Sequence, residues 1–177
     1  MKKNLPGDLS QEKIIERAIR VNHAGEYGAK YIYKGQIAIL KNSSLNGELQ
    51  HMLEQECRHL EFFNKQINKY KVRPSFLLPL WRVAGYALGA GTALMGKRYA
   101  MTCTAAVEDV IDDHYNAQLG FLPESALKEG IAKIREEEIE HQNTATDYIG
   151  KRKFMDRLLE SAIKRGCKLA ILVAQKL

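Results

Sequence analysis

Two copies of one side-chain pattern run through the sequence, and they constrain the fold more than any other feature. Each copy has a lone glutamate, followed at the same distance along the chain by a Glu-x-x-His pair. One constant spacing, the repeat offset, relates the first copy to the second. A pattern that recurs at a fixed offset indicates a repeated structural unit that supplies equivalent side chains twice. The copies are Glu26, Glu56 and His59, and Glu108, Glu138 and His141.

Each of these acids interrupts an apolar stripe with helical spacing. In one such stripe Glu56 and His59 follow Met52 and precede Phe63 at steps of three and four, which is one face of a helix. With only four prolines in the chain, long helices are favoured over a turn-rich β fold. We therefore expect an all-α protein. Its helices should lie at about 10–40, 48–70, 101–119, 124–148 and 154–176, with an apolar helix within 74–96.

The four striped helices are expected to form a ferritin-like four-helix bundle built from two repeated helical hairpins, with the two other helices as additions. One glutamate from each of two helices, and a Glu-x-x-His pair from each of the other two, is the inventory of bundles that hold two metal ions. Buried ion pairs are the alternative, since an ionised acid in a core is costly unless it is paired or binds metal. No lysine or arginine lies on the four stripes to balance the acids, which favours the metal site.

Carboxylate and imidazole ligands suit iron or manganese, and we expect two iron ions per chain. Zinc would also bind, but it would leave the redox potential of such a site unused. Glu56 and Glu138 are expected to bridge the two ions. Glu26 and His59 would complete one position, and Glu108 and His141 the other.

Further residues are candidates for supporting roles. A histidine ligand usually donates its second N–H to an acceptor, and either Glu137 or Asp112 could accept it, with plain solvation of both acids as an equal alternative. A third Glu-x-x-His pair, Glu48 and His51, has no copy at the repeat offset and is expected on the surface. The remaining expectations are His23 and His114 in supporting or packing positions, Tyr115 near the site, and Tyr33 and Tyr148 in the core.

Length and composition bound the rest. A chain of 177 residues with 45% hydrophobic residues suits one globular domain over 1–177. The cysteines Cys57, Cys103 and Cys167 are odd in number and form no C-x-x-C pair, so we expect free thiols. The N-terminal residues lack the apolar run of a signal peptide, which favours a cytosolic location, most simply in a bacterium, with a processed organellar protein left open.

The segment 74–96 suggests contact with a membrane. It carries Arg82 as its only charge, but Pro79 and Arg82 leave just 83–96 uninterrupted, shorter than the ~20 residues of a spanning helix. We therefore expect a peripheral, interfacial helix on an anionic leaflet, with a helix that merely caps the bundle as the alternative. The net charge of +6 fits this, and no nucleic-acid-binding motif occurs. The basic residues expected at this surface are Lys65, Lys69, Lys71, Arg73, Lys97, Arg98, Lys164, Arg165, Lys168 and Lys176.

The chain resembles the demethoxyubiquinone hydroxylases of ubiquinone biosynthesis. The six ligand candidates fall on that family's motif positions, while Asn22 and Asp109 stand where Asp and Glu are common, which affects only supporting detail. The stretches that carry the resemblance are RVNHAGEYGA (20–29), EQECRHLEFF (54–63), TAAVEDVIDDHYNAQL (104–119), REEEIEHQ (135–142) and AIKRGCKLAILVAQKL (162–177).

The resemblance implies a di-iron monooxygenase that inserts one oxygen from O₂ into the ring of a demethoxyubiquinol, the penultimate step of ubiquinone synthesis. It also implies a polyprenyl quinol substrate, a peripheral position on the cytoplasmic side of the bacterial cell membrane, NADH as ultimate reductant and an accessory lipid-binding protein. No G-x-G-x-x-G fingerprint identifies a dinucleotide site. An iron-storage protein, a lipid-binding scaffold and a di-iron quinol oxidase are the competing functions, and a homo-oligomer is left open.

Overall fold

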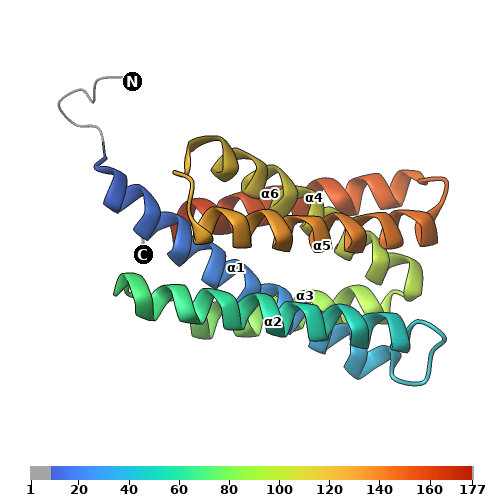
Figure 1. Ribbon diagram of the computed structural model, residues 1–177. Coiled ribbons are helices and arrows are strands. Elements are labelled where there is room, and N and C mark those ends of the chain that lie inside the picture. The colour runs from blue at the N-terminus through green and yellow to red at the C-terminus, as the bar shows by residue number, and fades with distance from the viewer. Residues whose placement is uncertain (1–8, 177) are drawn as a thin grey trace.

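The computed structural model describes residues 9–176, and these form six α-helices and no strands (Figure 1). This confirms the prediction of an all-α, ferritin-like bundle. The helices are α1 (Gln11–Leu40), α2 (Asn46–Tyr70), α3 (Leu78–Leu94), α4 (Lys97–Phe121), α5 (Ala126–Ile149) and α6 (Phe154–Ala174).

Local chemistry sets the helix ends. Ser10 and Ser125 each accept a hydrogen bond from a backbone N–H three residues on, so they cap α1 and α5. The second cap explains why α5 begins two residues later than the sequence suggested. Gly96 has a φ of 114°, which a residue with a side chain rarely adopts, and it separates α3 from α4. Only Met95 and Gly96 separate the two helices, so α4 begins at Lys97, earlier than the predicted start near Met101.

The six helices form two similar groups. α1 and α2 make one hairpin and α4 and α5 another, while α3 packs along α1 and α6 along α4 (Figure 1). The repeat offset that relates the sequence motifs also carries each helix of α1–α3 approximately onto its counterpart in α4–α6. The repeat thus extends beyond the predicted hairpin to a unit of three helices.

Two apolar clusters fill the bundle on either side of its middle. One includes Leu49 and Met52 of α2 with Met101 of α4, all essentially inaccessible to solvent. The other includes Ile19 of α1, Phe63 of α2 and Ile131 of α5. Along α1 and α2 the predicted ligands lie between the residues of these clusters, so apolar side chains enclose the middle of the bundle from both ends.

Glycines let α3 approach α1 more closely than side chains would permit. A Cβ atom on Gly85 would lie 2.6 Å from the carbonyl oxygen of Gly28. A Cβ on Gly89 would overlap the backbone carbonyl of Ile32, and one on Gly35 would overlap that of Tyr86. Backbone cannot move aside as the end of a flexible side chain can, so these three glycines fix the position of α3.

Among residues 9–176, no helix combines the length and apolar character needed to cross a bilayer.

The substitution Gly89→Ala should destabilise the protein by about 1–3 kcal/mol, the usual cost of overpacking. The matched control is Gly91→Ala on the same helix, where a Cβ would meet no atom within 4 Å. There alanine should be neutral or stabilising by up to about 1 kcal/mol because it is the better helix former. Urea unfolding of both variants measures the difference, and equal midpoints would contradict a close α1–α3 contact.

Candidate metal centre

The structure brings the six predicted ligands together in the middle of the bundle, one or two from each of α1, α2, α4 and α5. All six are almost completely buried. Their ligand atoms form two groups, in each of which all atoms lie within 4.8 Å of one another. The groups share Glu56 and Glu138, as expected for bridging residues. Glu26 and His59 complete the first group, and Glu108 and His141 complete the second.

The two histidines present the same nitrogen to the acids. The Nδ1 atom of His59 lies 3.0 Å from Glu138 Oε1 and 3.5 Å from Glu26 Oε2. The Nδ1 atom of His141 lies 3.2 Å from Glu138 Oε2 and 3.5 Å from Glu56 Oε1. In both rings Nε2 points away from the cluster, so Nδ1 is the atom available to a metal.

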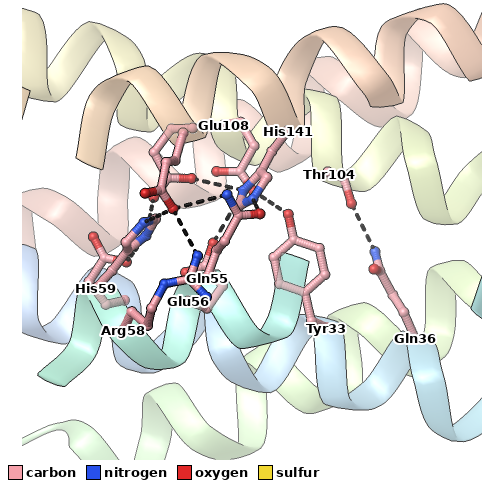
Figure 2. A network of polar contacts seen from close by, with 12 residues as sticks. Tyr33, Gln36, Gln55, Glu56, Arg58, His59, Thr104, Glu108 and His141 are labelled. Atoms are coloured by element: carbon pink, nitrogen blue, oxygen red, sulfur yellow. Dashed lines mark hydrogen bonds and ion pairs between the residues drawn. The ribbon is translucent and has the colours of Figure 1, made fainter. Parts of the chain in front are cut away.

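The outward-facing nitrogens are held by a second layer of polar groups (Figure 2). His59 Nε2 lies 3.1 Å from Glu137 Oε2, so of the two candidate acceptors the structure places Glu137 there. His141 Nε2 lies 3.0 Å from Gln55 Oε1, and Gln55 in turn donates to Glu137 over 2.9 Å. The sequence reasoning missed Gln55, although the repeat offset relates it to Glu137 and could have revealed it.

Two buried tyrosines hold the non-bridging acids. Tyr33 donates a hydrogen bond of 2.7 Å to Glu108, and Tyr115 donates one to Glu26. The two tyrosines are themselves related by the repeat offset, so each half of the protein supplies the tyrosine for the other half's glutamate. Burial and the neighbouring carboxylates raise the pKa of both phenols well above the usual range, which keeps them as hydrogen-bond donors.

Amide side chains repeat in the same way one layer further out. Gln36 donates to Thr104 over 3.3 Å, while Gln118 and Asn22 exchange hydrogen bonds of 2.7 and 2.8 Å. Gln36 corresponds to Gln118 and Asn22 to Thr104 through the repeat offset. The internal symmetry therefore reaches beyond the ligands into the polar groups that surround them.

The cluster has the properties of a cation site. Its buried ligand atoms without a hydrogen-bond partner are Glu26 Oε2, both oxygens of Glu56, His59 Nδ1, Glu108 Oε2 and Glu138 Oε1. An orphaned buried acceptor costs about 1–3 kcal/mol, so such a concentration needs a partner. Among the described residues, no lysine or arginine forms an ion pair with any of the four acids. Two divalent cations would fit this donor set and its charge.

The comparison with known proteins decides the family. The family description "Ubiquinone biosynthesis protein COQ7" matches residues 13–174. The chain belongs to the COQ7 family. A relative from Rhodospirillum rubrum, named 3-demethoxyubiquinol 3-hydroxylase, is 47% identical over 175 residues, which cover 97% of this chain and 82% of the relative.

Eukaryotic members are also similar to this COQ7-family chain. The Mus musculus protein, named NADPH-dependent 3-demethoxyubiquinone 3-hydroxylase, mitochondrial, is 45% identical over 92% of this chain and 77% of its own length. The Saccharomyces cerevisiae protein, named 5-demethoxyubiquinone hydroxylase, mitochondrial, is 37% identical over 95% of this chain and 80% of its own. These relatives confirm the family predicted from the motifs.

In this COQ7-family protein the charge states of the metal-free cluster follow from burial and mutual contact. Burial, and then the charge of Glu138, raise the pKa of Glu56 well above its usual range, and Glu108 is affected in the same way. Burial alone would raise the pKa of Glu138, but close contacts with the two histidines outweigh it and lower that pKa to about 2. Burial alone would lower the pKa of His59, but contacts with Glu138 and Glu26 raise it to about 12.

Other predicted candidates lie elsewhere. Asp112 pairs with Arg135 at 2.6 Å and contacts neither histidine, so its proposed role was wrong. Tyr148 has an exposed fraction of 45%, so the prediction that it packs in the core was also wrong. His51 is exposed and belongs to neither ligand group, which agrees with a surface position.

The remaining histidines and the cysteines stand outside the ligand groups. His23 of α1 lies 3.0 Å from Asn64 through Nε2, and His114 of α4 lies 2.7 Å from Gln118 through Nε2, so each is held by an amide side chain and neither belongs to a ligand group. All three cysteines are free thiols, as predicted. Burial raises the pKa of Cys103 to about 12, so at neutral pH it stays in the thiol form, which is not the nucleophilic one.

A large apolar cavity borders α1 and α4, the helices that carry Glu26 and Glu108. It has a volume of about 550 Å³ and is lined by residues of α1, α3, α4 and α6. Its walls include Ala29, one helical turn after Glu26, and Val107, which precedes Glu108. Trp81 and Leu88 of α3 and Ala170 of α6 also line it. The cavity therefore lies between the two outer helices, α3 and α6, and the two helices that carry Glu26 and Glu108.

Proposed function

We propose that this protein hydroxylates the ring of a demethoxyubiquinol with O₂ at a di-iron centre, the penultimate step of ubiquinone biosynthesis. The protein is a hydroxylase of the ubiquinone biosynthesis family, in keeping with its relatives' names. The single observation that carries the site is the buried cluster of four glutamates and two histidines with unpartnered ligand atoms.

The proposed ligand roles follow the two groups of atoms. Glu56 and Glu138 would bridge both ions, because their oxygens belong to both groups. Glu26 and His59 would complete one position, and Glu108 and His141 the other. Bound iron would supply the redox chemistry that lets O₂ react with the quinol ring.

The protein's own residues orient and protect this centre. Tyr33 and Tyr115 each hold one oxygen of a non-bridging glutamate, which leaves the other oxygen without a partner and available to a metal. The apolar clusters on both sides limit the access of bulk water, which would otherwise quench a reactive oxidant. Both effects arise from packing and do not depend on the identity of the metal.

The apolar cavity is the proposed place for the substrate. Its lining is almost wholly apolar, as needed for a polyprenyl tail, and it reaches the helices of Glu26 and Glu108. The quinol ring would approach the centre from this side. A flat aromatic ring bound there would lie between the two outer helices and the ligand-bearing bundle.

Exposed apolar side chains on the outer helices support a membrane-bound position. On and beside α3 and α6 they include Phe76, Val83 and Leu94, and Phe154 and Leu169, all more than half exposed. We propose peripheral binding to the cytoplasmic face of the bacterial cell membrane through this surface. Arg98 was expected among its basic residues, but it donates to Asp156 of α6 and to the backbone carbonyls of Ile149 and Lys151, so it is not free for lipid.

The reductant and partners are proposed in the same way. Relatives are named NADPH-dependent, and a reduced nicotinamide nucleotide is therefore the proposed electron source, with NADH the expected one for this chain. An accessory lipid-binding protein would present the substrate. A homo-oligomer is compatible with the same surface.

Oxygen labelling tests the function directly. Anaerobically iron-loaded protein is mixed with a short-tailed demethoxyquinol and heavy-isotope O₂, and mass spectrometry reads the product. The expected result is one labelled oxygen on the ring, absent from Glu138→Ala. If no labelled product forms while iron uptake continues well beyond two ions per chain, the protein is an iron-storage protein and the hydroxylase proposal fails.

A further inference from the structure

The internal repeat is broken at one functional position. Gln55 and Glu137 are related by the repeat offset, and each directly precedes a bridging glutamate. Each lies within hydrogen-bond distance of the outward-facing nitrogen of the other half's histidine: Gln55 is 3.0 Å from His141 Nε2, and Glu137 is 3.1 Å from His59 Nε2. The two histidines are thus supported by different chemistry. One acceptor is a neutral amide and the other is a carboxylate.

The surrounding groups do not cancel this difference. The ligands themselves are equivalent in the two halves, and so are the tyrosines that hold Glu26 and Glu108. The cation beside Glu137 is Arg58, whose guanidinium lies 3.4 Å away and is more than half exposed, so solvent screens it. Gln55 also donates to Glu137, which links both histidines in one hydrogen-bonded chain.

We propose that Gln55 and Glu137 are positioning residues that make the two metal positions unequal, with the position completed by His59 binding a divalent metal more tightly. A carboxylate that accepts the second N–H of an imidazole makes the ring a stronger metal ligand and fixes its orientation more firmly than a neutral acceptor does. Glu137 also adds a negative charge beside the His59 position. The inference rests on the proposed two-metal centre and assigns an order to it.

The first test is a titration of the metal-free protein with Co²⁺, followed by the visible absorption of the bound ion. The wild-type protein should bind two ions in two steps of different affinity. Glu137→Gln keeps an acceptor for His59 but removes the charge, and it should weaken the tighter step by about 10–100-fold, the usual effect of changing such a partner. The control, Glu136→Gln, removes the same charge from an exposed neighbour and should change neither step.

The sharper test exchanges the two groups. In the double variant Gln55→Glu with Glu137→Gln, the net charge is kept. The amide then at position 137 can donate to the carboxylate then at position 55, which preserves the hydrogen-bonded chain. The order of filling should reverse. Adding His59→Gln or His141→Gln identifies the steps, because His59→Gln should remove the tighter step in the wild type and the weaker step in the exchanged protein.

The outcomes separate this inference from the proposed function. Binding of no cobalt by the wild-type protein would overturn the two-metal centre and the inference together. Binding of two ions in an order that the exchange leaves unchanged would overturn only the inference. Circular dichroism and thermal unfolding of the metal-free variants establish that each is folded.

Discussion

Replacing Glu138 with alanine will remove both metal positions at once and abolish oxygen insertion. Glu138 is completely buried and contributes an oxygen to both ligand groups. Its two oxygens also lie 3.0 Å from His59 and 3.2 Å from His141, so alanine would remove the nearest inward-facing partner of both rings. Loss of a supporting group typically weakens metal binding by about 10–100-fold, and loss of a direct ligand should weaken it further.

The matched control is Glu140→Ala, which removes an exposed acid from the same helix two residues away. Metal content after iron loading, measured by atomic emission together with product formation, distinguishes the two variants. Glu138→Ala should retain far less than two ions per chain, while Glu140→Ala should match the wild type. A folded Glu138→Ala protein that keeps both ions and its activity would refute the bridging role.

The sequence reveals the six cluster residues because three independent patterns coincide on them. Helical spacing puts Glu56 and His59 on one face, the residue types suit a metal, and the repeat duplicates the arrangement at Glu138 and His141. None of these patterns depends on how the helices pack against one another. The grouping of atoms around two shared glutamates follows from the same symmetry.

The supporting residues were harder to predict because their roles depend on how neighbouring helices face each other. Asp112 is one turn after Glu108, yet it reaches Arg135 on α5 and not a histidine. Tyr148 is one heptad after His141, but Ile149, four residues after the buried Ala145, takes the buried place at the end of α5 and leaves Tyr148 exposed. Gln55 acquires its role only when α2 faces the opposite half.

The same internal symmetry explains why four buried carboxylates lie close together with little positive charge nearby to balance them. Each half supplies a tyrosine to the other half's glutamate and a supporting group to the other half's histidine, so neither half can complete the site alone. The four carboxylates then meet where the two halves join, and only protons or cations can offset their repulsion. Metal binding should therefore be a competition with protons.

Raising the pH should strengthen metal binding, and the effect should be large. In the metal-free protein burial raises the pKa of Glu56 and of Glu108, and the carboxylates around His59 outweigh its burial and raise its pKa to about 12. His59 therefore holds a proton at neutral pH, and Glu56 and Glu108 hold their protons to a higher pH than exposed glutamates do. A metal ion needs the carboxylates ionised and the imidazoles neutral, and it must displace these protons. For each proton that the metal displaces, its affinity rises about tenfold with each unit of increasing pH, as long as the pH is below the pKa of the group that loses the proton.

The direction of this pH dependence follows from the fact that the metal-free form, and not the metal-bound form, carries the protons. Because the raised pKa values keep protons on the metal-free protein, higher pH lowers the cost of losing them and affinity rises. Apparent dissociation constants for Mn²⁺ should fall by at least about tenfold per unit between about pH 6 and about pH 8, because the His59 proton alone must be displaced throughout this range. Calorimetry in buffers with different ionisation enthalpies counts the released protons directly. A dissociation constant that does not change with pH, with no proton release, would mean that the cluster is already ionised before the metal arrives, and would contradict the raised pKa values of the two glutamates.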